Sequence, residues 1–193
     1  MHIAIFIYGM TGGGAQRRIL TLMQEFACRG HRIDLIKAFA LLRRQRMARL
    51  VILGEGNLRN KLTRLVEDLG VSADVDMPGF VSNPLAWMSR ASLFVLSSAS
   101  EGLPGVLIEA MAAGCPVVST NCPSGPAEIL ENGRYGSLVT VGDHIALAKA
   151  IAMTLNSPHD TEFLRNRALA FSVNKAVDGY LEVLSRVAAR NGA

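Results

Sequence analysis

Short apolar runs alternate with amphipathic segments along most of the 193-residue chain. Continuous runs at Ile3–Tyr8, Leu50–Leu53 and Leu93–Leu96 are typical of strands buried on both faces of a parallel sheet. Between such runs, leucine and valine recur at helical spacing, for example over Leu58–Leu69 and Val173–Val187. The pattern predicts an α/β fold in which helices cover both faces of a parallel sheet.

The beginning of the chain predicts a unit of strand, loop, helix and strand. Ile3–Tyr8 is its first strand, a helix is expected at about 15–28, and a second strand is expected at Arg32–Ile36. A further helix is expected at Lys37–Arg46, with no loop before it. Because strand-to-helix loops usually take about 2–6 residues, this junction is anomalous.

Basic residues concentrate in one short segment. The chain has a net charge of +4, and the segment 37–49 contains lysine and arginine but no acidic residue. This composition indicates either the solvated face of a helix or contact with an anionic partner, such as a nucleotide, a phospholipid surface or a nucleic acid. Nucleic acid is disfavoured because aromatic residues are few and are not interleaved with the basic ones.

The cysteines and the hydropathy point to a cytoplasmic protein. Cys28, Cys115 and Cys122 are too few and too scattered for a disulfide framework, and their spacing fits no metal site. We therefore expect reduced thiols and a cytoplasmic location, with peripheral contact at the inner face of the cell membrane as an option. No apolar stretch reaches the ~20 residues that span a bilayer, and the apolar N-terminus lacks the basic lead of a signal peptide.

Three consecutive glycines follow the first predicted strand. Gly12, Gly13 and Gly14 precede a helix, and free amides and the helix dipole favour a phosphate at such a place. The glycines lack the spacing of the G-x-G-x-x-G fingerprint, so a plain tight turn is an equal alternative.

Two glutamates lie in the loop and helix that follow Leu93–Leu96. Glu101 lies in the loop, at the strand end where open parallel sheets bind ligands. Glu109 lies in an otherwise apolar helix, where a buried carboxylate is costly unless it is hydrogen-bonded. Two ribose hydroxyls would suit it; the alternatives are a salt bridge to a buried arginine and a dipole interaction near the helix start. The polar groups of the loop that could hold a sugar and a diphosphate are Ser97, Ser98, Ser100 and the amides of Gly102–Gly105.

Two further turns follow other predicted strands. The first contains Gly54, Glu55 and Gly56, and the second contains Phe80 and Val81. Each alone indicates only a turn. Together they would line one crevice, because successive parallel strands end at the same edge of a sheet.

These segments together resemble the retaining glycosyltransferases of family 4, the group 1 glycosyl transferases with the GT-B arrangement of two facing Rossmann-like domains. The most specific part is Glu101 and Glu109, which lie in one loop and helix with seven residues between them. The other segments that match the family are Gly13–Arg17, Leu50–Gly56, Pro78–Val81, Phe94–Ser98, Glu101–Pro104, Glu109–Met111, Gly114–Ser119 and Phe171–Val173.

The resemblance implies a role for each candidate residue. In the family the C-terminal domain binds a nucleotide diphospho-sugar, here a UDP- or GDP-sugar, and Glu109 would accept the ribose hydroxyls. Glu101, as the catalytic residue, would contact the transferred sugar with the amides of Gly102 and Leu103. The remaining donor-binding positions are Gly54, Glu55, Gly56, Phe80, Val81, Ser98 and Pro104, with Gly12, Gly13 and Gly14 as the phosphate loop.

The chain also departs from the family. Members run to about twice this length, and the segments that carry the family's diphosphate-holding Arg and Lys and its acceptor-side histidine are absent. We therefore expect an internal deletion between residues 36 and 37. Residues 1–36 would be a remnant of the acceptor-side N-terminal domain, and residues 37–193 the C-terminal domain without its first strand, ending in a crossover helix at 173–188. Either Arg32–Ile36 or Ile3–Tyr8 would then fill the missing strand's place in one merged sheet.

The function implied is sugar transfer with retention from a nucleotide donor to a lipid-linked or polysaccharide acceptor, in polysaccharide biosynthesis. Without the basic pair we expect transfer to be very slow or nil, because two charges on the departing diphosphate need cationic partners. The alternatives are a non-catalytic nucleotide-sugar-binding protein, an inactive remnant and a nucleotide-sugar epimerase. No cofactor or metal is expected, because no histidine cluster occurs.

Overall fold

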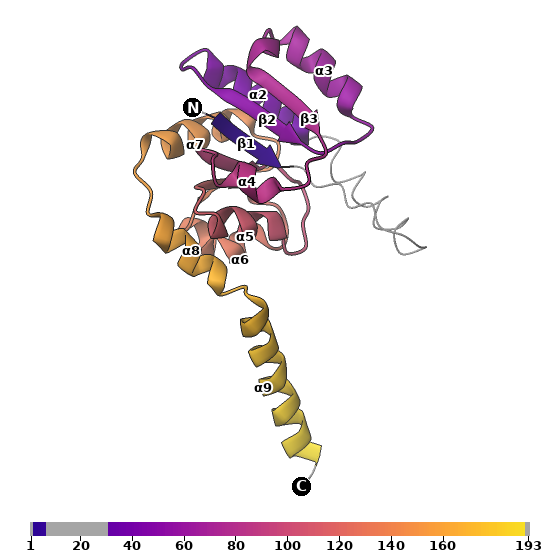
Figure 1. The fold of residues 1–193 in the computed structure, drawn as a ribbon, viewed down its shortest axis with the longest axis vertical. Helices are drawn as coiled ribbons and strands as arrows, with labels where there is room; N and C mark the ends of the chain where they lie inside the picture. The colour runs from indigo at the N-terminus through magenta and orange to yellow at the C-terminus, as the bar shows by residue number, and fades with distance from the viewer. Residues whose placement is uncertain (1, 7–30, 192–193) are drawn as a thin grey trace.

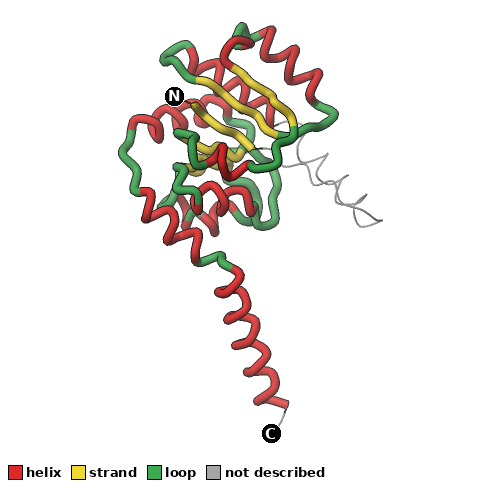
Figure 2. Tube along the Cα trace, viewed as in Figure 1, coloured by secondary structure: helices red, strands yellow, loops and turns green. Residues whose placement is uncertain are grey.

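One parallel six-stranded sheet organises the computed structural model, which describes residues 2–6 and 31–191. The strands lie in the order β3-β2-β1-β4-β5-β6, and every neighbouring pair is parallel (Figures 1 and 2). The strands are β1 (His2–Phe6), β2 (Arg49–Leu53), β3 (Val75–Gly79), β4 (Leu93–Leu96), β5 (Val117–Thr120) and β6 (Ser137–Val139).

Helices cover both faces of this sheet and enclose two apolar cores. The strands supply both cores in alternation, so that Leu93 and Val95 of β4 face one core and Phe94 and Leu96 face the other. Helices α2, α3 and α7 cover the first core, and α4, α5, α6 and α8 cover the second. The helices are α2 (His31–Arg43), α3 (Arg59–Asp68), α4 (Pro84–Met88), α5 (Gly105–Ala112), α6 (Pro126–Ile129), α7 (His144–Asn156), α8 (Thr161–Leu169) and α9 (Val173–Asn191).

Strand β1 occupies the middle of the sheet. It pairs with β2 along its whole length, Ile3 opposite Leu50 and Ala4 opposite Val51, and with β4 on its other side. Either Arg32–Ile36 or Ile3–Tyr8 was expected at this place in a merged sheet, and the structure has the N-terminal stretch there. The first strand of the chain therefore joins the two halves of the sheet.

The strand predicted at Arg32–Ile36 is wrong. Helix α2 runs without a break from His31 to Arg43, through the position where an abrupt strand-to-helix junction was expected. Leu35, Phe39 and Leu42 recur at helical spacing and are all buried, and α2 packs against α7. The anomaly therefore disappears, and the boundary at residues 36 and 37 falls inside α2. The derivation of residues 1–36 from a second domain stays a prediction.

Two arginines of the basic segment 37–49 form an ion pair and hydrogen bonds within the protein. Arg43 pairs with Asp74 at 2.7 Å and donates to the carbonyl oxygen of Arg46 at 3.1 Å. Arg46 in turn donates to Oδ1 of Asn156, in the last turn of α7, at 2.8 Å. These contacts fix the turn between α2 and β2, so a structural role accounts for two of the arginines.

Helix α9 projects away from the sheet (Figure 1). Its large apolar side chains are exposed, including Tyr180 at 73% and Leu184 at 62%. A helix over 173–188 is confirmed, whereas its crossing onto another domain stays a prediction. Within residues 2–6 and 31–191, no helix combines the length and the apolar character needed to cross a membrane.

We predict that Ala4→Pro in β1 lowers the free energy of unfolding by the order of 3 kcal/mol, because proline removes a ladder donor from a central strand. Urea unfolding followed by circular dichroism measures the change. Ala188→Pro in α9 is the control, since that helix lies outside both cores, and it should leave the main transition in place. Equal stability of Ala4→Pro and the wild-type chain would contradict the central position of β1.

Candidate functional site

The candidate site lies where the strands end. Because all six strands are parallel, the segments that follow β2, β3, β4 and β5 emerge at the same edge of the sheet. These segments carry every predicted site residue that the structure describes. Gly12, Gly13 and Gly14 lie outside the described residues.

The loop after β4 is fixed by side-chain hydrogen bonds. The hydroxyl of Ser98 donates to Oε1 of Glu101 at 2.5 Å. Behind it, the buried hydroxyl of Thr120, at the end of β5, contacts the carbonyl oxygens of Ser98 at 2.5 Å and Leu96 at 3.4 Å. The half-buried carboxylate of Glu101 is therefore held at a defined place at the sheet edge.

Gly125 packs directly on this loop. It adopts φ +81°, and a Cβ at this position would overlap the carbonyl oxygen of Gly102 and Cδ of Pro104. Only glycine satisfies both the backbone conformation and the close approach. Sequence reasoning missed Gly125; its only signal was the turn composition of Cys122–Gly125.

The backbone of the loop exposes donors toward solvent. In the described part of the chain, the amides of Gly102 and Leu103 donate to no protein acceptor, and both residues are exposed. Leu103 itself is 55% exposed. Two free amides beside a fixed carboxylate can bind a sugar hydroxyl or a phosphate oxygen.

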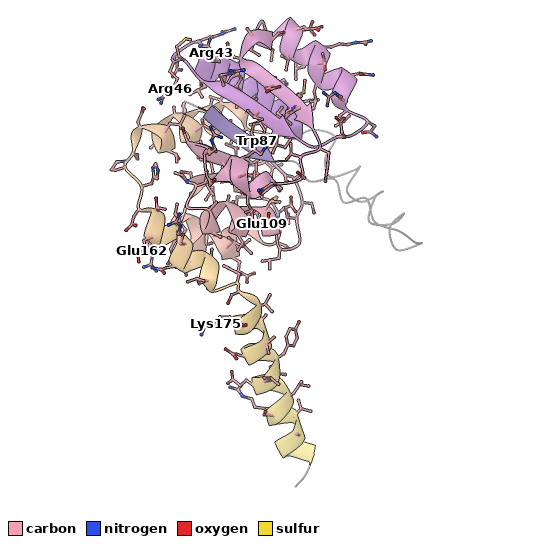
Figure 3. All side chains as sticks on the ribbon, in the orientation of Figure 1. Arg43, Arg46, Trp87, Glu109, Glu162 and Lys175 are labelled. Carbon is pink, nitrogen blue, oxygen red and sulfur yellow. The ribbon has the colours of Figure 1, made fainter. Side chains whose placement is uncertain are left out.

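Glu109 lies in α5, and its surroundings differ from the expectation of a costly buried carboxylate. Leu107, Ala110 and Met111 form the buried face of α5, whereas Glu109 is exposed (Figure 3). Among the described residues no cation lies within ion-pair distance of it, so no described arginine forms the alternative salt bridge. Its role as a ligand group stays a prediction.

The turn after β2 is closed by an ion pair. Glu55 accepts from Arg59 at 2.6 Å, and Arg59 also donates to the carbonyl oxygen of Met77 at 2.7 Å. The amide of Gly54 donates to the carbonyl oxygen of Gly79 at 2.7 Å, which ties β2 to the end of β3. Gly54 and Gly56 therefore lie at the predicted edge, but the charge of Glu55 is already matched.

Phe80 and Val81 follow β3 at the same edge. The ring of Phe80 is 72% exposed, and Val81 is half-buried against the second core. An exposed aromatic ring at a ligand-binding edge can stack on a planar group such as a nucleobase.

Two thiols are buried in the described residues: Cys122 lies near Glu101, whereas Cys115 precedes β5 and contacts the carbonyl oxygen of Ala91, before β4. Burial raises the pKa of the Cys115 thiol to about 12. Burial also raises the pKa of the Cys122 thiol, and the charge of Glu101 raises it further. Both cysteines are free, and both stay protonated at neutral pH, which disfavours a thiolate nucleophile; Cys28 lies outside the described residues. The described residues contain no cluster of His, Cys, Asp and Glu suited to a metal.

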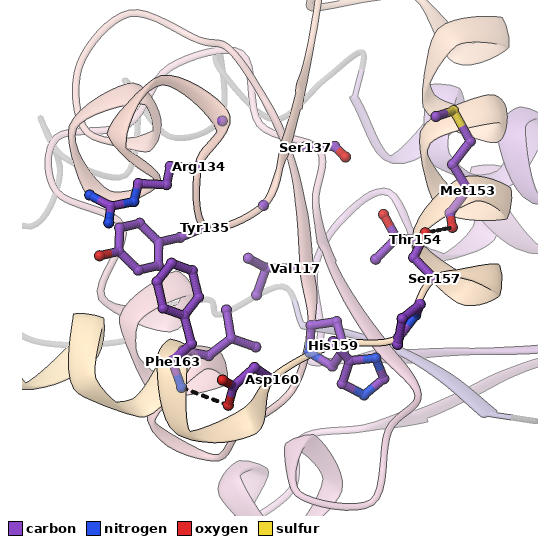
Figure 4. Close-up of a pocket in the computed structure, with 15 residues that line it drawn as sticks. Val117, Arg134, Tyr135, Ser137, Met153, Thr154, Ser157, His159, Asp160 and Phe163 are labelled. Atoms are coloured by element: carbon purple, nitrogen blue, oxygen red, sulfur yellow. Dashed lines mark hydrogen bonds between the residues drawn. The ribbon is translucent and has the colours of Figure 1, made fainter.

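A separate cavity of about 360 Å³ opens at the opposite edge of the sheet. It lies between the starts of β5 and β6, the end of α7 and the start of α8 (Figure 4). Sequence reasoning did not find it, because its walls come from segments far apart in the chain that share no motif.

The comparisons with known proteins agree with the α/β fold. The family model described as Glycosyl transferases group 1 matches residues 18–170. The chain is 34% identical over 172 residues to the putative glycosyltransferase EpsD of Bacillus subtilis. This match covers 86% of this chain and 45% of that protein. It is 34% identical over 134 residues to a Campylobacter jejuni N-acetylgalactosaminyltransferase that is named for a diphospho-undecaprenol substrate, with coverage of 69% and 36%.

Solved structures show the same fold. Anabaena Alr3699/HepE in complex with UDP matches 96% of this chain and 48% of its own, with a TM-score of 0.72 and 21% identity. Sucrose-phosphate synthase of Thermosynechococcus elongatus matches 98% and 46%, with a TM-score of 0.69 and 23% identity. In each of these four matches, the chain spans less than half the length of the other protein. The extent of the family match shows that this chain belongs to the Glycosyl transferases group 1 family and has a GT-B-type α/β fold.

Proposed function

We propose that the chain binds a UDP- or GDP-linked sugar at the carboxyl edge of its sheet and serves sugar transfer with retention to a lipid-linked or polysaccharide acceptor. The observation that carries this proposal is the fixed loop after β4, in which Ser98 holds Glu101 beside the free amides of Gly102 and Leu103. A transferred sugar and its phosphate need such preorganised acceptors and donors.

The exposed groups around this loop fit the rest of a nucleotide. Glu109 offers two carboxylate oxygens to the vicinal hydroxyls of a ribose, which donate strong charge-assisted bonds to an ionised acceptor. Phe80 offers an exposed ring to the base, and Val81 an apolar side chain beside it. In this assignment Glu101 is the catalytic residue, while Ser98 and Pro104 shape the loop.

Binding without efficient transfer is the second candidate function. The segments 97–105 and 121–125 contain no lysine or arginine to neutralise a departing diphosphate. The chain also spans less than half of each reported relative. We therefore expect nucleotide binding to be retained and transfer to be slow when this chain is alone.

Calorimetry with UDP and GDP tests the site directly. Glu109→Gln should weaken binding of the preferred nucleotide about 10- to 100-fold, because two hydrogen bonds to a charged acceptor are replaced by weaker ones. Glu162→Gln is the matched control, an exposed glutamate on α8 whose loss should leave affinity unchanged (Figure 3). If neither UDP nor GDP binds to the wild-type chain, the proposed function is refuted.

A second prediction concerns Gly125. Gly125→Ala should displace the Gly102–Pro104 turn and weaken nucleotide binding at least about tenfold, since a Cβ overlaps that turn. Gly70→Ala is the matched control, because Gly70 has φ +68° but open space around it. Gly70→Ala should lose about 1–2 kcal/mol of stability from backbone strain alone, and Gly125→Ala should lose more, because φ +81° with ψ −65° is a more strained conformation for alanine. If both retain wild-type affinity in calorimetry, Gly125 does not position the loop.

A further inference from the structure

The cavity at the amino edge of the sheet is separate from the candidate donor site. Val117 and Ser137, the first residues of β5 and β6, lie in its wall (Figure 4). Thr120, which holds the Glu101 loop, lies three residues further along β5, or about 10 Å at the usual strand rise. A ligand in this cavity would therefore not occupy the carboxyl edge.

Uncommitted hydroxyls line the cavity. Those of Ser137 and Thr154 turn into the space between β6 and α7 (Figure 4), and neither has a hydrogen-bond partner among the described residues. Asp160 uses Oδ1 to cap α8 through the amides of Glu162 and Phe163, which leaves its second oxygen to accept from a ligand. These groups both donate and accept, as the hydroxyls of a ligand do.

Apolar surface lies beside these groups. The rings of Tyr135 and Phe163 are stacked with centroids 4.4 Å apart, and Phe163 is 36% exposed. Met153, on α7 across the cavity, is 69% exposed. The cavity thus combines apolar faces with a few convergent polar groups, as ligand pockets usually do.

The titratable side chains that line the cavity are those of Arg134, Tyr135, His159 and Asp160. Arg134 pairs with Glu131 at 3.1 Å and lies over the rings of Tyr135 and Phe163, at 5.3 and 5.7 Å from their centroids. No lysine lines the cavity. No group of metal-binding side chains occurs in the part of the chain that the structure describes.

We propose that this cavity binds a neutral carbohydrate, one or two sugar residues of a glycan chain, independently of the nucleotide site. A sugar presents hydroxyls that bond both ways and C–H faces that pack on apolar side chains. The volume of about 360 Å³ equals that of about a dozen water molecules, which is enough for such a ligand. This second site does not depend on the proposed donor chemistry.

Heteronuclear NMR on the full chain tests the site, with maltose and N,N′-diacetylchitobiose as probes. At least one disaccharide should cause saturable shifts in residues 135–137 and 153–160, and the shifts should persist when UDP is present. Inorganic phosphate should not produce them. Shifts that are abolished by UDP, or no saturable shift with either disaccharide up to tens of millimolar, would overturn the proposal. Because this measurement uses the unmodified chain, it does not depend on the folding of any variant.

A paired substitution tests the assigned groups. Ser137→Ala combined with Thr154→Val keeps the shape of the wall and removes both hydroxyls, and should lower disaccharide affinity about tenfold. Thr63→Val on α3 is the control, since its hydroxyl bonds the carbonyl oxygen of Arg59, away from the cavity, and affinity should not change. Nucleotide affinity should be the same in all three chains. Undiminished disaccharide binding by the double variant would contradict the assignment of these hydroxyls.

Discussion

The insertion of β1 between β2 and β4 is the constraint on which the rest of the structure depends. In a sheet of the order β3-β2-β1-β4-β5-β6, removal of β1 leaves two separate halves. The turns after β2 and β3 lie in one half, and the loops after β4 and β5 lie in the other. A helix cannot replace the hydrogen-bond ladder that β1 forms with both neighbours, so the single carboxyl edge exists only because the N-terminal residues complete it.

At that edge, three contacts hold the loop after β4 in position. Thr120 fixes the carbonyl oxygen of Ser98, Ser98 fixes the carboxylate of Glu101, and Gly125 supports the backbone at Gly102 from the other side. Two of these contacts act on the backbone of the loop and the third holds the end of the Glu101 side chain, which leaves little freedom in the loop. Glu109 and Phe80 are different, because they are exposed and no comparable contact holds them among the described residues. In the proposed function they would adapt to the nucleotide, whereas the Glu101 loop is formed in advance.

The regular part of the fold could be predicted from the sequence because strands such as Leu93–Leu96 are continuous apolar runs. Arg32–Ile36 could not, since Ile33, Leu35 and Ile36 fit a strand as well as a helix until burial of Phe39 and Leu42 on the same face decides between them. The exposure of Glu109 also required the structure, because an apolar sequence around a residue does not say which face of the helix it occupies. Gly125 and the second cavity depend on contacts between distant segments, which one sequence does not contain.

Strand β5 connects the two edges of the molecule. Its first residue, Val117, lies in the wall of the amino-edge cavity, and its last, Thr120, holds the loop of Glu101. Val118 and Ser119 between them are buried and paired with both neighbouring strands, so β5 is a rigid spacer rather than a moving part. A glycan segment held at one end and a sugar nucleotide held at the other would then be kept at a fixed separation. Such an arrangement requires no conformational change in the sheet, so we expect little coupling free energy between the two binding events.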